Sequence, residues 1–181
     1  MSVIEKAKQY ALKAHGEQKY GEFPYSHHLE QVQRNLNIYA TKIGDAEHAA
    51  AWLHDTLEDT DTTFEQLYTE FGRIVARLVF ACTDEPGVNR KERHQRTHPK
   101  LMAAGRSAIA IKLADRISNV EHSLKYNHDM FKMYQKEYIE FKKALHIPGE
   151  LKDMWAHLDV LINHNIEPPK ERKSTDGVPN E

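Results

Sequence analysis

The sequence lacks most of the features that mark secreted or membrane-bound proteins. Cys82 is its only cysteine, so no internal disulfide can form, and this usage fits a reducing compartment. No stretch approaches the roughly 20 consecutive apolar residues of a membrane span. The N-terminus has no basic segment followed by an apolar one, so it does not resemble a secretory signal. We therefore expect a cytoplasmic protein without a membrane partner.

An excess of charge of one sign is also missing. Lysine and arginine total 25, aspartate and glutamate total 27, and the formal net charge is −2. A broad grip on a nucleic-acid backbone needs a clustered basic surface, so we expect no nucleic-acid partner. A small basic pocket is still compatible with this balance, and nothing in the composition fixes an oligomeric state.

Helical periodicity is what the sequence has in abundance. Its 8 glycines and 7 prolines fall mostly between segments with apolar residues at helical spacing. This pattern predicts an all-α fold with one domain over residues 1–166 and a disordered tail over 167–181, which has almost nothing to bury. We predict loops over 16–26 and 99–105. Helices are predicted over 2–15, 27–42, from 45 onward, 63–71, 72–83, 89–97, 107–126, 129–145 and 149–164.

Two helix starts carry recognisable capping signals. Asp45 is a fair N-cap for the third helix, and Thr62 with Glu65 three residues later has the pattern of a capping box. The third helix contains the run Ala49 to Leu53 and is apolar nearly all round. Such a helix is usually buried at the centre of a bundle.

The same apolar helix ends in His54, Asp55, Glu58 and Asp59. Four ionisable groups within six buried residues are costly unless something compensates them, and a divalent cation would do so. On a continuous helix the pairs His54/Glu58 and Asp55/Asp59 would each share a face. His54 and Asp55 could then hold a metal, with Glu58 and Asp59 beside its water. The alternative interpretation is a solvated helix end that caps the next turn.

Two further places strengthen the metal interpretation. Histidines 27 and 28 follow Pro24 and Tyr25 at a predicted junction of loop and helix. Asp115 lies inside a second strongly apolar helix, where a carboxylate needs a partner. That partner is either a metal or a neighbouring base, Arg116 or Lys112.

Three motifs in register carry a family resemblance. They are Pro24-Tyr25-x-x-His28, His54-Asp55-Thr-x-Glu58-Asp59-Thr60 and Lys112-Leu-Ala-Asp115-Arg116-x-x-Asn119. The set resembles the HD-domain hydrolases of the RelA/SpoT type, and is most similar to the stand-alone small alarmone hydrolases, over roughly residues 5–145. The resemblance implies an all-α HD-domain helical bundle with a single divalent metal, typically Mn²⁺, although other divalent metals suit the same ligands. Its implied ligands are His28, His54, Asp55 and Asp115.

The resemblance also implies an activity. The expected reaction is metal-dependent hydrolysis of the 3′-diphosphate of guanosine tetra- or pentaphosphate (ppGpp or pppGpp), which releases pyrophosphate and GDP or GTP. Glu58 and Asp59 would serve the hydrolytic water, and Asn119 would contact the ribose, with His122 as a second candidate contact. The motif spacing selects His28 over His27, which would substitute only if the helix start shifted by one residue.

One departure from the family affects substrate choice. The family usually has an Arg-Lys pair before Pro-Tyr, whereas this chain has Lys19 followed by Tyr20, with Phe23 beside Pro24. An aromatic ring can also stack on a base, so Tyr20 or Phe23 could replace the missing arginine. We therefore predict substrate contacts at Lys19, Tyr20, Asn119 and His122. The alternatives are another nucleotide, either 3′-phosphorylated or NADPH, and a nucleotide-binding module without catalysis.

A basic segment from Asn89 to His98 has two interpretations. It is either an exposed helix face or a source of one or two contacts to the polyphosphate end of the substrate. The small alarmone hydrolases have a comparable stretch, which favours the second. The sequence does not choose among Arg90, Lys91, Arg93 and Arg96.

Overall fold

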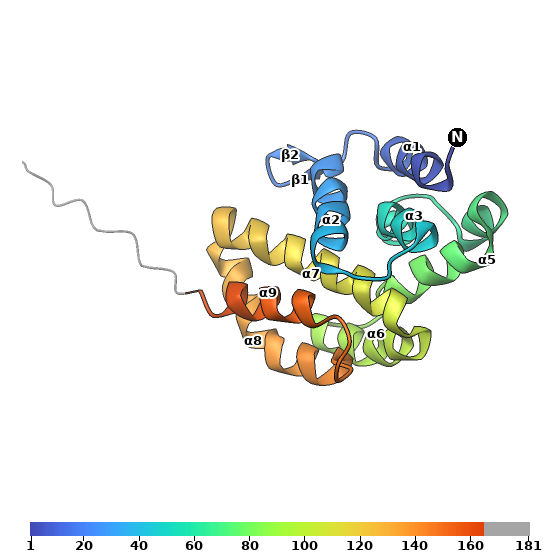
Figure 1. The fold of residues 1–181 in the computed structure, drawn as a ribbon. Coiled ribbons are helices and arrows are strands. Elements are labelled where there is room, and N and C mark those ends of the chain that lie inside the picture. Colours follow the sequence, from blue (N-terminus) through green and yellow to red (C-terminus); the bar gives the residue numbers. More distant parts are fainter. Residues whose placement is uncertain (165–181) are drawn as a thin grey trace, which may run out of the picture.

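The computed structural model describes residues 1–164, and its helices pack around one another with a single short hairpin between the first two (Figure 1). The all-α expectation is confirmed. Residues 165–166 of the predicted domain and the predicted tail, 167–181, lie outside the described part of the chain. The elements, in chain order, are α1 (Val3–His15), β1 (Lys19–Tyr20), β2 (Phe23–Pro24), α2 (Tyr25–Tyr39), α3 (Asp45–Leu53), α4 (Thr56–Asp59), α5 (Phe64–Cys82), α6 (Arg90–Ala104), α7 (Arg106–Tyr126), α8 (His128–Leu145) and α9 (Lys152–Ile162).

Helix α7 is the central element of the bundle. It contacts α2, α3, α5, α6, α8 and α9, and it runs through the middle of the molecule in Figure 1. Ile109, Ile111, Leu113 and Ile117 are fully buried on it, which fits the apolar run from Ala108 to Ile111 near its start. The polar residues that α7 buries must therefore find partners inside the protein.

Helix α3 is the second buried helix. Ala49, Ala50 and Ala51 have no exposed surface, and α1, which buries Ala7 and Ala11, packs against it. Small side chains let the two backbones approach closely. The prediction of a central, all-apolar helix is confirmed, and this helix delivers His54 and Asp55 to the interior.

The predicted continuity of α3 through Asp59 is wrong. The helix ends at Leu53, and α4 begins only at Thr56. The Thr56 hydroxyl donates to the Leu53 carbonyl oxygen at 2.7 Å, so a side chain satisfies a group that the break leaves without its helical partner. His54 and Asp55 therefore lie on a turn between two helices, although the Asp59 N–H still donates to the Asp55 carbonyl at 2.9 Å, as in a helical turn.

The capping predictions are off by one residue. Gly44, not Asp45, is the N-cap of α3, and Glu47 accepts from its backbone N–H at 3.1 Å. The capping box of α5 uses Thr63 and Gln66, not Thr62 and Glu65. The predicted break after residue 71 is present as a kink within α5, where Gly72 has φ 80°.

The predicted loops at 16–26 and 99–105 are each only partly correct. Residues Lys19–Pro24 pair as a two-stranded hairpin of two residues per strand, too short for an alternating pattern. Helix α6 continues through Pro99 to Ala104, because Leu101 beyond the proline is fully buried and tertiary packing outweighs the proline penalty. The helix stops at Gly105, which has φ 84°.

Candidate functional site

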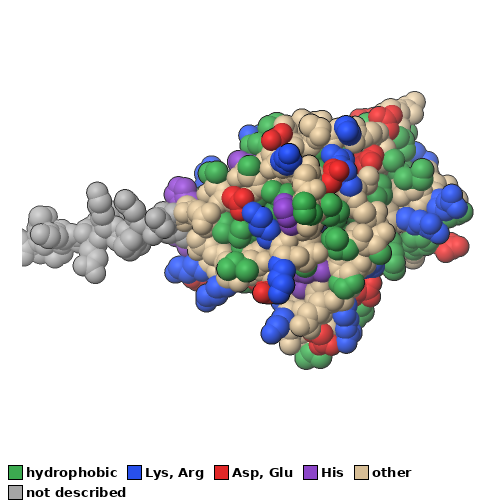
Figure 2. All heavy atoms as spheres, turned by 60° about the horizontal axis from the view of Figure 1, so that its bottom comes forward, with side chains coloured by type: hydrophobic (Ala, Val, Ile, Leu, Met, Phe, Trp, Pro, Cys, Tyr) green, Lys and Arg blue, Asp and Glu red, His purple; other side chains and the backbone are tan. Residues whose placement is uncertain are grey.

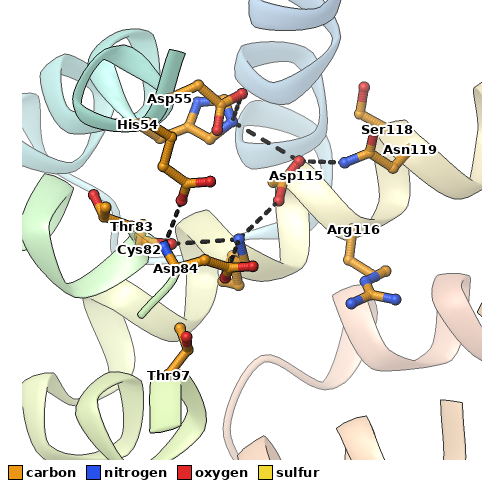
Figure 3. A network of polar contacts seen from close by, with 12 residues as sticks. His54, Asp55, Cys82, Thr83, Asp84, Thr97, Asp115, Arg116, Ser118 and Asn119 are labelled. Carbon is orange, nitrogen blue, oxygen red and sulfur yellow. Dashed lines mark hydrogen bonds and ion pairs between the residues drawn. The ribbon is translucent and has the colours of Figure 1, made fainter. Parts of the chain in front are cut away.

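Three buried side chains from three elements meet beside α7. They are His28 on α2, His54 on the turn after α3, and Asp115 on α7, each offering one ligand atom within 4.8 Å of the other two. Asp115 Oδ1 lies 3.4 Å from His28 Nε2 and 3.8 Å from His54 Nε2. Figure 3 marks the contact between His54, on the turn after α3, and Asp115 on α7. His28 and Asp115 lie 26 and 61 positions from His54 in the sequence, yet all three form one cluster.

Asp55 closes the side of this cluster. Its Oδ2 lies 2.9 Å from His54 Nε2 and 3.5 Å from His28 Nε2. The Tyr25 hydroxyl donates to the same oxygen at 2.5 Å. Burial and the carboxylate of Asp55 raise the pKa of Tyr25, so its hydroxyl remains a donor. Tyr25 belongs to a motif quoted above, but no pattern in the sequence predicted this contact.

Partners behind each imidazole set its orientation. The Ala51 carbonyl lies 2.9 Å from His54 Nδ1, and because a carbonyl only accepts, Nδ1 must carry the proton. The Nε2 atom of His54 therefore faces the cluster. The Nδ1 of His28 contacts the Ser118 hydroxyl at 3.0 Å, and its Nε2 faces inward too. Such outer partners are typical of metal-binding histidines.

His28, rather than His27, faces the cluster. The His27 ring instead stacks on Phe23 with ring centroids 4.6 Å apart, outside the group of ligand atoms. Ser118 was missed by the sequence reasoning. Its position three residues after Asp115 on a helix was the available signal, since that spacing places both on one face.

The electrostatics of the cluster favour a cation. Burial opposes every charge here, yet the neighbouring carboxylates hold the pKa of both His28 and His54 above the usual value. In turn, and against the effect of burial, His54 holds the pKa of Asp55 well below its usual range, and Lys112 does the same for Asp115. Two imidazoles and two carboxylates at these distances are a donor set that fits a divalent metal with mixed nitrogen and oxygen ligands.

Glu58 and Asp59 line the same cavity as the cluster, which has a volume of about 190 Å³. The Asp84 backbone N–H donates to Glu58 Oε1 at 2.5 Å. Although Glu58 as a residue is exposed, its carboxyl group reaches into the cavity. The loss of hydration there raises its pKa to about 7, with Asp55 and Asp84 adding to the effect. A carboxyl with this pKa is well suited to take a proton near neutral pH.

Lys112 links the two acidic sides of the cavity. Its Nζ lies 3.3 Å from the Cys82 carbonyl oxygen, 3.4 Å from Asp115 Oδ2 and 3.8 Å from Asp84 Oδ1. These contacts join α7 to the last residue of α5 and to Asp84 beyond it; Figure 3 labels Cys82, Asp84 and Asp115 in this network. Burial opposes its charge, but Asp115 and Asp84 raise the pKa of Lys112, so it stays an ammonium. Burial raises the pKa of the Cys82 thiol to about 12, so the thiol stays protonated within the core.

The other end of the cavity is basic. Arg90 Nε lies 2.7 Å from Glu137 Oε1, and Arg116 Nη1 lies 3.2 Å from Glu137 Oε2. Two guanidinium groups thus share one carboxylate. Of the four basic residues in the 90–98 segment, only Arg90 lines this cavity. Glu137 was missed because it lies on α8, and no local pattern links it to either arginine.

The predicted substrate contacts divide into three that meet and one that lies apart. The Tyr20 hydroxyl donates to Asn119 Oδ1 at 2.7 Å, and the Asn119 amide donates to Asp115 Oδ1 at 2.5 Å. The Tyr20 ring stacks on His28, and His122 packs against its other side, with centroids 4.7 and 4.3 Å away. Lys19 is exposed and does not line the cavity.

Tyr20 is the wall between two cavities. One is the polar cavity of the cluster. The other is a cleft of about 200 Å³, which is also lined by His27, Gln31, His122, Lys125 and Tyr126. Tyr20 is therefore placed to contact a ligand in either space.

The fold and the cluster define a helical protein with a buried histidine and aspartate centre. The family model described as HD domain matches residues 7–139, and the chain belongs to the HD domain family. This agrees with the resemblance seen in the sequence, and it places the cluster within the matched region.

Named relatives are similar over most of the same region. The guanosine-3′,5′-bis(diphosphate) 3′-pyrophosphohydrolase of Aquifex aeolicus is 36% identical over 165 residues, which are 84% of this chain but only 23% of that protein. The enzyme of the same name, MESH1, from Danio rerio is 36% identical over 66% of this chain and 68% of its own length. A solved structure described as a metazoan ortholog of SpoT that hydrolyzes ppGpp and plays a role in starvation responses superposes with a TM-score of 0.77 at 26% identity. That match covers 89% of this chain and 94% of the other.

The outer surface adds two observations. None of the helices in residues 1–164 combines the length and apolar character that a membrane crossing requires. On the face shown in Figure 2, basic and acidic side chains are interspersed, with hydrophobic ones between them. The absence of a nucleic-acid partner stays a prediction.

Proposed function

We propose that this chain is a metal-dependent hydrolase of guanosine tetra- and pentaphosphate, working in the cytoplasm. It would release pyrophosphate from the ribose 3′ position and leave GDP or GTP. The observation that carries this proposal is the buried cluster of His28, His54 and Asp115, which shares a cavity with Glu58 and Asp59. The names of the relatives support the choice of substrate.

The proposed metal ligands are His28, His54, Asp55 and Asp115. Manganese accepts mixed imidazole and carboxylate ligands, and iron, cobalt or zinc would also accept them. When bound, a divalent cation lowers the pKa of water and withdraws charge from a phosphoryl oxygen. The partners of the two histidines behind the cluster, Ala51 and Ser118, would keep both Nε2 atoms turned toward the ion.

The acidic residues of α4 would handle the water. Glu58 would take its proton, since its carboxyl has a pKa of about 7 and lies in the cavity. Asp59 would orient the water from the neighbouring position. The water oxygen bonds to the phosphorus attached to the ribose 3′ oxygen. The bond between that phosphorus and the 3′ oxygen breaks, and the oxygen leaves and takes up a proton from solvent.

The basic end of the cavity would hold the phosphates. Arg90 and Arg116 share the charge of Glu137, so one positive charge is left to face an anion. A guanidinium group suits phosphate because its planar donors match two oxygens. Glu137 also keeps Arg116 in place, so that arginine would serve both the fold and the substrate.

The ribose and base would lie toward Tyr20. Asn119 would contact the ribose, and Tyr20 with His122 would face the base in the adjoining cleft, while Lys19 would approach from the exposed hairpin. If Tyr20→Ala and Phe23→Ala both left the KM unchanged, aromatic stacking at this hairpin would be excluded.

A second candidate substrate follows from Tyr20 itself. Its phenol ring occupies the wall where the family has a basic pair, and its hydroxyl engages Asn119. This difference favours another nucleotide, 3′-phosphorylated or NADPH, with the same metal chemistry.

Product analysis separates these candidates. Protein loaded with Mn²⁺ would be incubated with ppGpp, GTP, a 3′-phosphorylated adenosine nucleotide and NADPH, beside a variant carrying His54→Ala and Asp55→Ala. We expect GDP and pyrophosphate from ppGpp, and neither from the variant. Turnover of another nucleotide with ppGpp untouched would establish the second candidate. No turnover by protein with bound metal would indicate a nucleotide-binding module.

A further inference from the structure

Asp59 lies on an element that cannot fix its position alone. Helix α4 has only four residues and follows a break in the chain. A single helical turn has little stability of its own, because the cost of nucleation is not yet offset. A carboxylate that orients water must nevertheless be held within a fraction of an ångström. Something outside α4 must therefore hold Asp59.

Gln18, between α1 and the hairpin, makes that contact. Its Nε2 donates to Asp59 Oδ2 at 3.0 Å across 41 residues of sequence. On the other side of the same amide, its Oε1 lies 2.8 Å from His15 Nδ1. Because a carboxylate only accepts, the amide nitrogen must face Asp59, and the amide oxygen then faces His15. His15 therefore donates through Nδ1, and this bond prevents the Gln18 amide from turning over.

His15 is itself firmly anchored. It is the last residue of α1, only 6% of its surface is exposed, and its ring stacks on Tyr25 with centroids 4.3 Å apart and planes 17° apart. The backbone ties the segment at both ends. The Gln18 N–H donates to the His15 carbonyl, and the Tyr25 N–H donates to the Gln18 carbonyl, each at 3.0 Å. Tyr25 in turn donates to Asp55, so one anchor supports both acidic groups.

We propose that His15 and Gln18 are positioning residues for Asp59, with His15 fixing the Gln18 amide and Gln18 fixing the Asp59 carboxylate. This rests on the proposed function for the role of Asp59 in turnover. The hydrogen bonds themselves do not depend on it, so the pair can be tested with and without activity.

A double-mutant cycle tests the link to Asp59. We expect Gln18→Ala to lower kcat about 10- to 100-fold, with KM within about twofold, as misplacement of a reacting group does. In an Asp59→Ala background the same substitution should change kcat by less than about twofold, because both act through one contact. Gln9→Ala, which removes an exposed glutamine of α1, should have no effect. Equal losses in both backgrounds would overturn the proposal.

Two substitutions at His15 separate its hydrogen bond from its packing. His15→Asn keeps an N–H near the position of Nδ1 but loses the ring. His15→Phe keeps a ring to stack on Tyr25 but donates nothing. We expect the asparagine variant to retain a kcat several-fold higher than the phenylalanine variant. The opposite order would assign His15 a packing role only and contradict the proposal.

A measurement without substrate keeps the proposal testable if no nucleotide is turned over. The side-chain amide signals of Gln18, identified by their loss in Gln18→Ala, can be followed by ¹⁵N NMR. They should shift in Asp59→Ala and in His15→Phe but not in Asp61→Ala, a matched loss of a carboxylate two residues away. Unchanged signals in Asp59→Ala would overturn the positioning pair. Absent turnover with shifted signals would contradict only the proposed function.

Discussion

The two ends of the cavity balance their charges in opposite ways. At one end Asp55, Glu58 and Asp59, with Asp115, outnumber the bases around them. At the other end Arg90 and Arg116 share the single carboxylate of Glu137. The first end has an excess of negative charge, and the second has an excess of positive charge.

This difference in charge between the two ends should orient a bound substrate. Charges in a partly buried space act on one another more strongly than in water. The acidic end therefore favours a cation and the basic end an anion, so a phosphorylated substrate would bridge them with its reacting phosphorus near the metal. Substitutions at the two ends should therefore have different consequences for turnover and for substrate binding.

Substitution of the proposed metal ligands should abolish metal binding at the acidic end. We expect His54→Ala and Asp55→Ala, alone or together, to lower turnover more than about 10³-fold, because the metal chemistry is lost. The metal content of the protein should fall together with turnover, as measured by elemental analysis of the dialysed protein. Circular dichroism checks that the variants remain folded. Full metal content with normal turnover would contradict the assignment of this end.

Glu58→Gln should leave the metal in place and remove the proton acceptor. We expect kcat to fall about 10²- to 10⁴-fold, with KM and metal content nearly unchanged. The wild-type kcat should fall as the pH drops through a midpoint at or below about 7, because Glu58 must be ionised and a nearby cation favours the carboxylate. This acidic limb should be missing from the residual activity of the variant. A variant that keeps the limb would show that another group accepts the proton.

Arg90→Gln tests the basic end. The substitution removes one donor while Arg116 continues to pair with Glu137, so the fold should hold. We expect KM to rise about tenfold and kcat to change little, since the contact is to a charged group of the bound substrate. Arg96→Gln is a matched control, because Arg96 is exposed and pairs with Glu92 outside the cavity. Equal effects of both substitutions would remove the distinction between the two ends.

Tyr20→Phe should have the smallest effect. It keeps the ring between the two cavities and removes only the bond to Asn119. We expect KM to change by less than about fivefold, which corresponds to the net free-energy contribution of one neutral hydrogen bond. Steady-state kinetics with ppGpp provide the measurement. A loss of more than a hundredfold would instead give the hydroxyl a direct part in the reaction.

The acidic end was largely predictable from the sequence, and the basic end was not. Four ionisable groups beside the apolar run Ala49 to Leu53 require compensation wherever the helix breaks, so the prediction of a site survives the error about helix continuity. Asp115 was identifiable in the same way, as one carboxylate inside the apolar helix α7. These signals are local, and burial can be inferred from the neighbouring residues.

The contacts that were missed join distant elements. Glu137 meets Arg90 across 47 residues, and Gln18 meets Asp59 across 41. Each is a polar residue on a segment whose exposure looks ordinary, so nothing in its neighbours marks it as a partner. The break at His54 and Asp55 was also missed; there the His54 ring and the Thr56 hydroxyl bond to the backbone carbonyls of Ala51 and Leu53.

The most direct measurement is the fate of the water oxygen. The protein would hydrolyse ppGpp in H₂¹⁸O, and mass spectrometry of the separated products would locate the label. If the acidic end delivers water to the phosphorus on the ribose 3′ oxygen, pyrophosphate should carry one ¹⁸O and GDP none. Label in GDP, or release of inorganic phosphate instead of pyrophosphate, would contradict the placement of the reacting phosphorus at the acidic end.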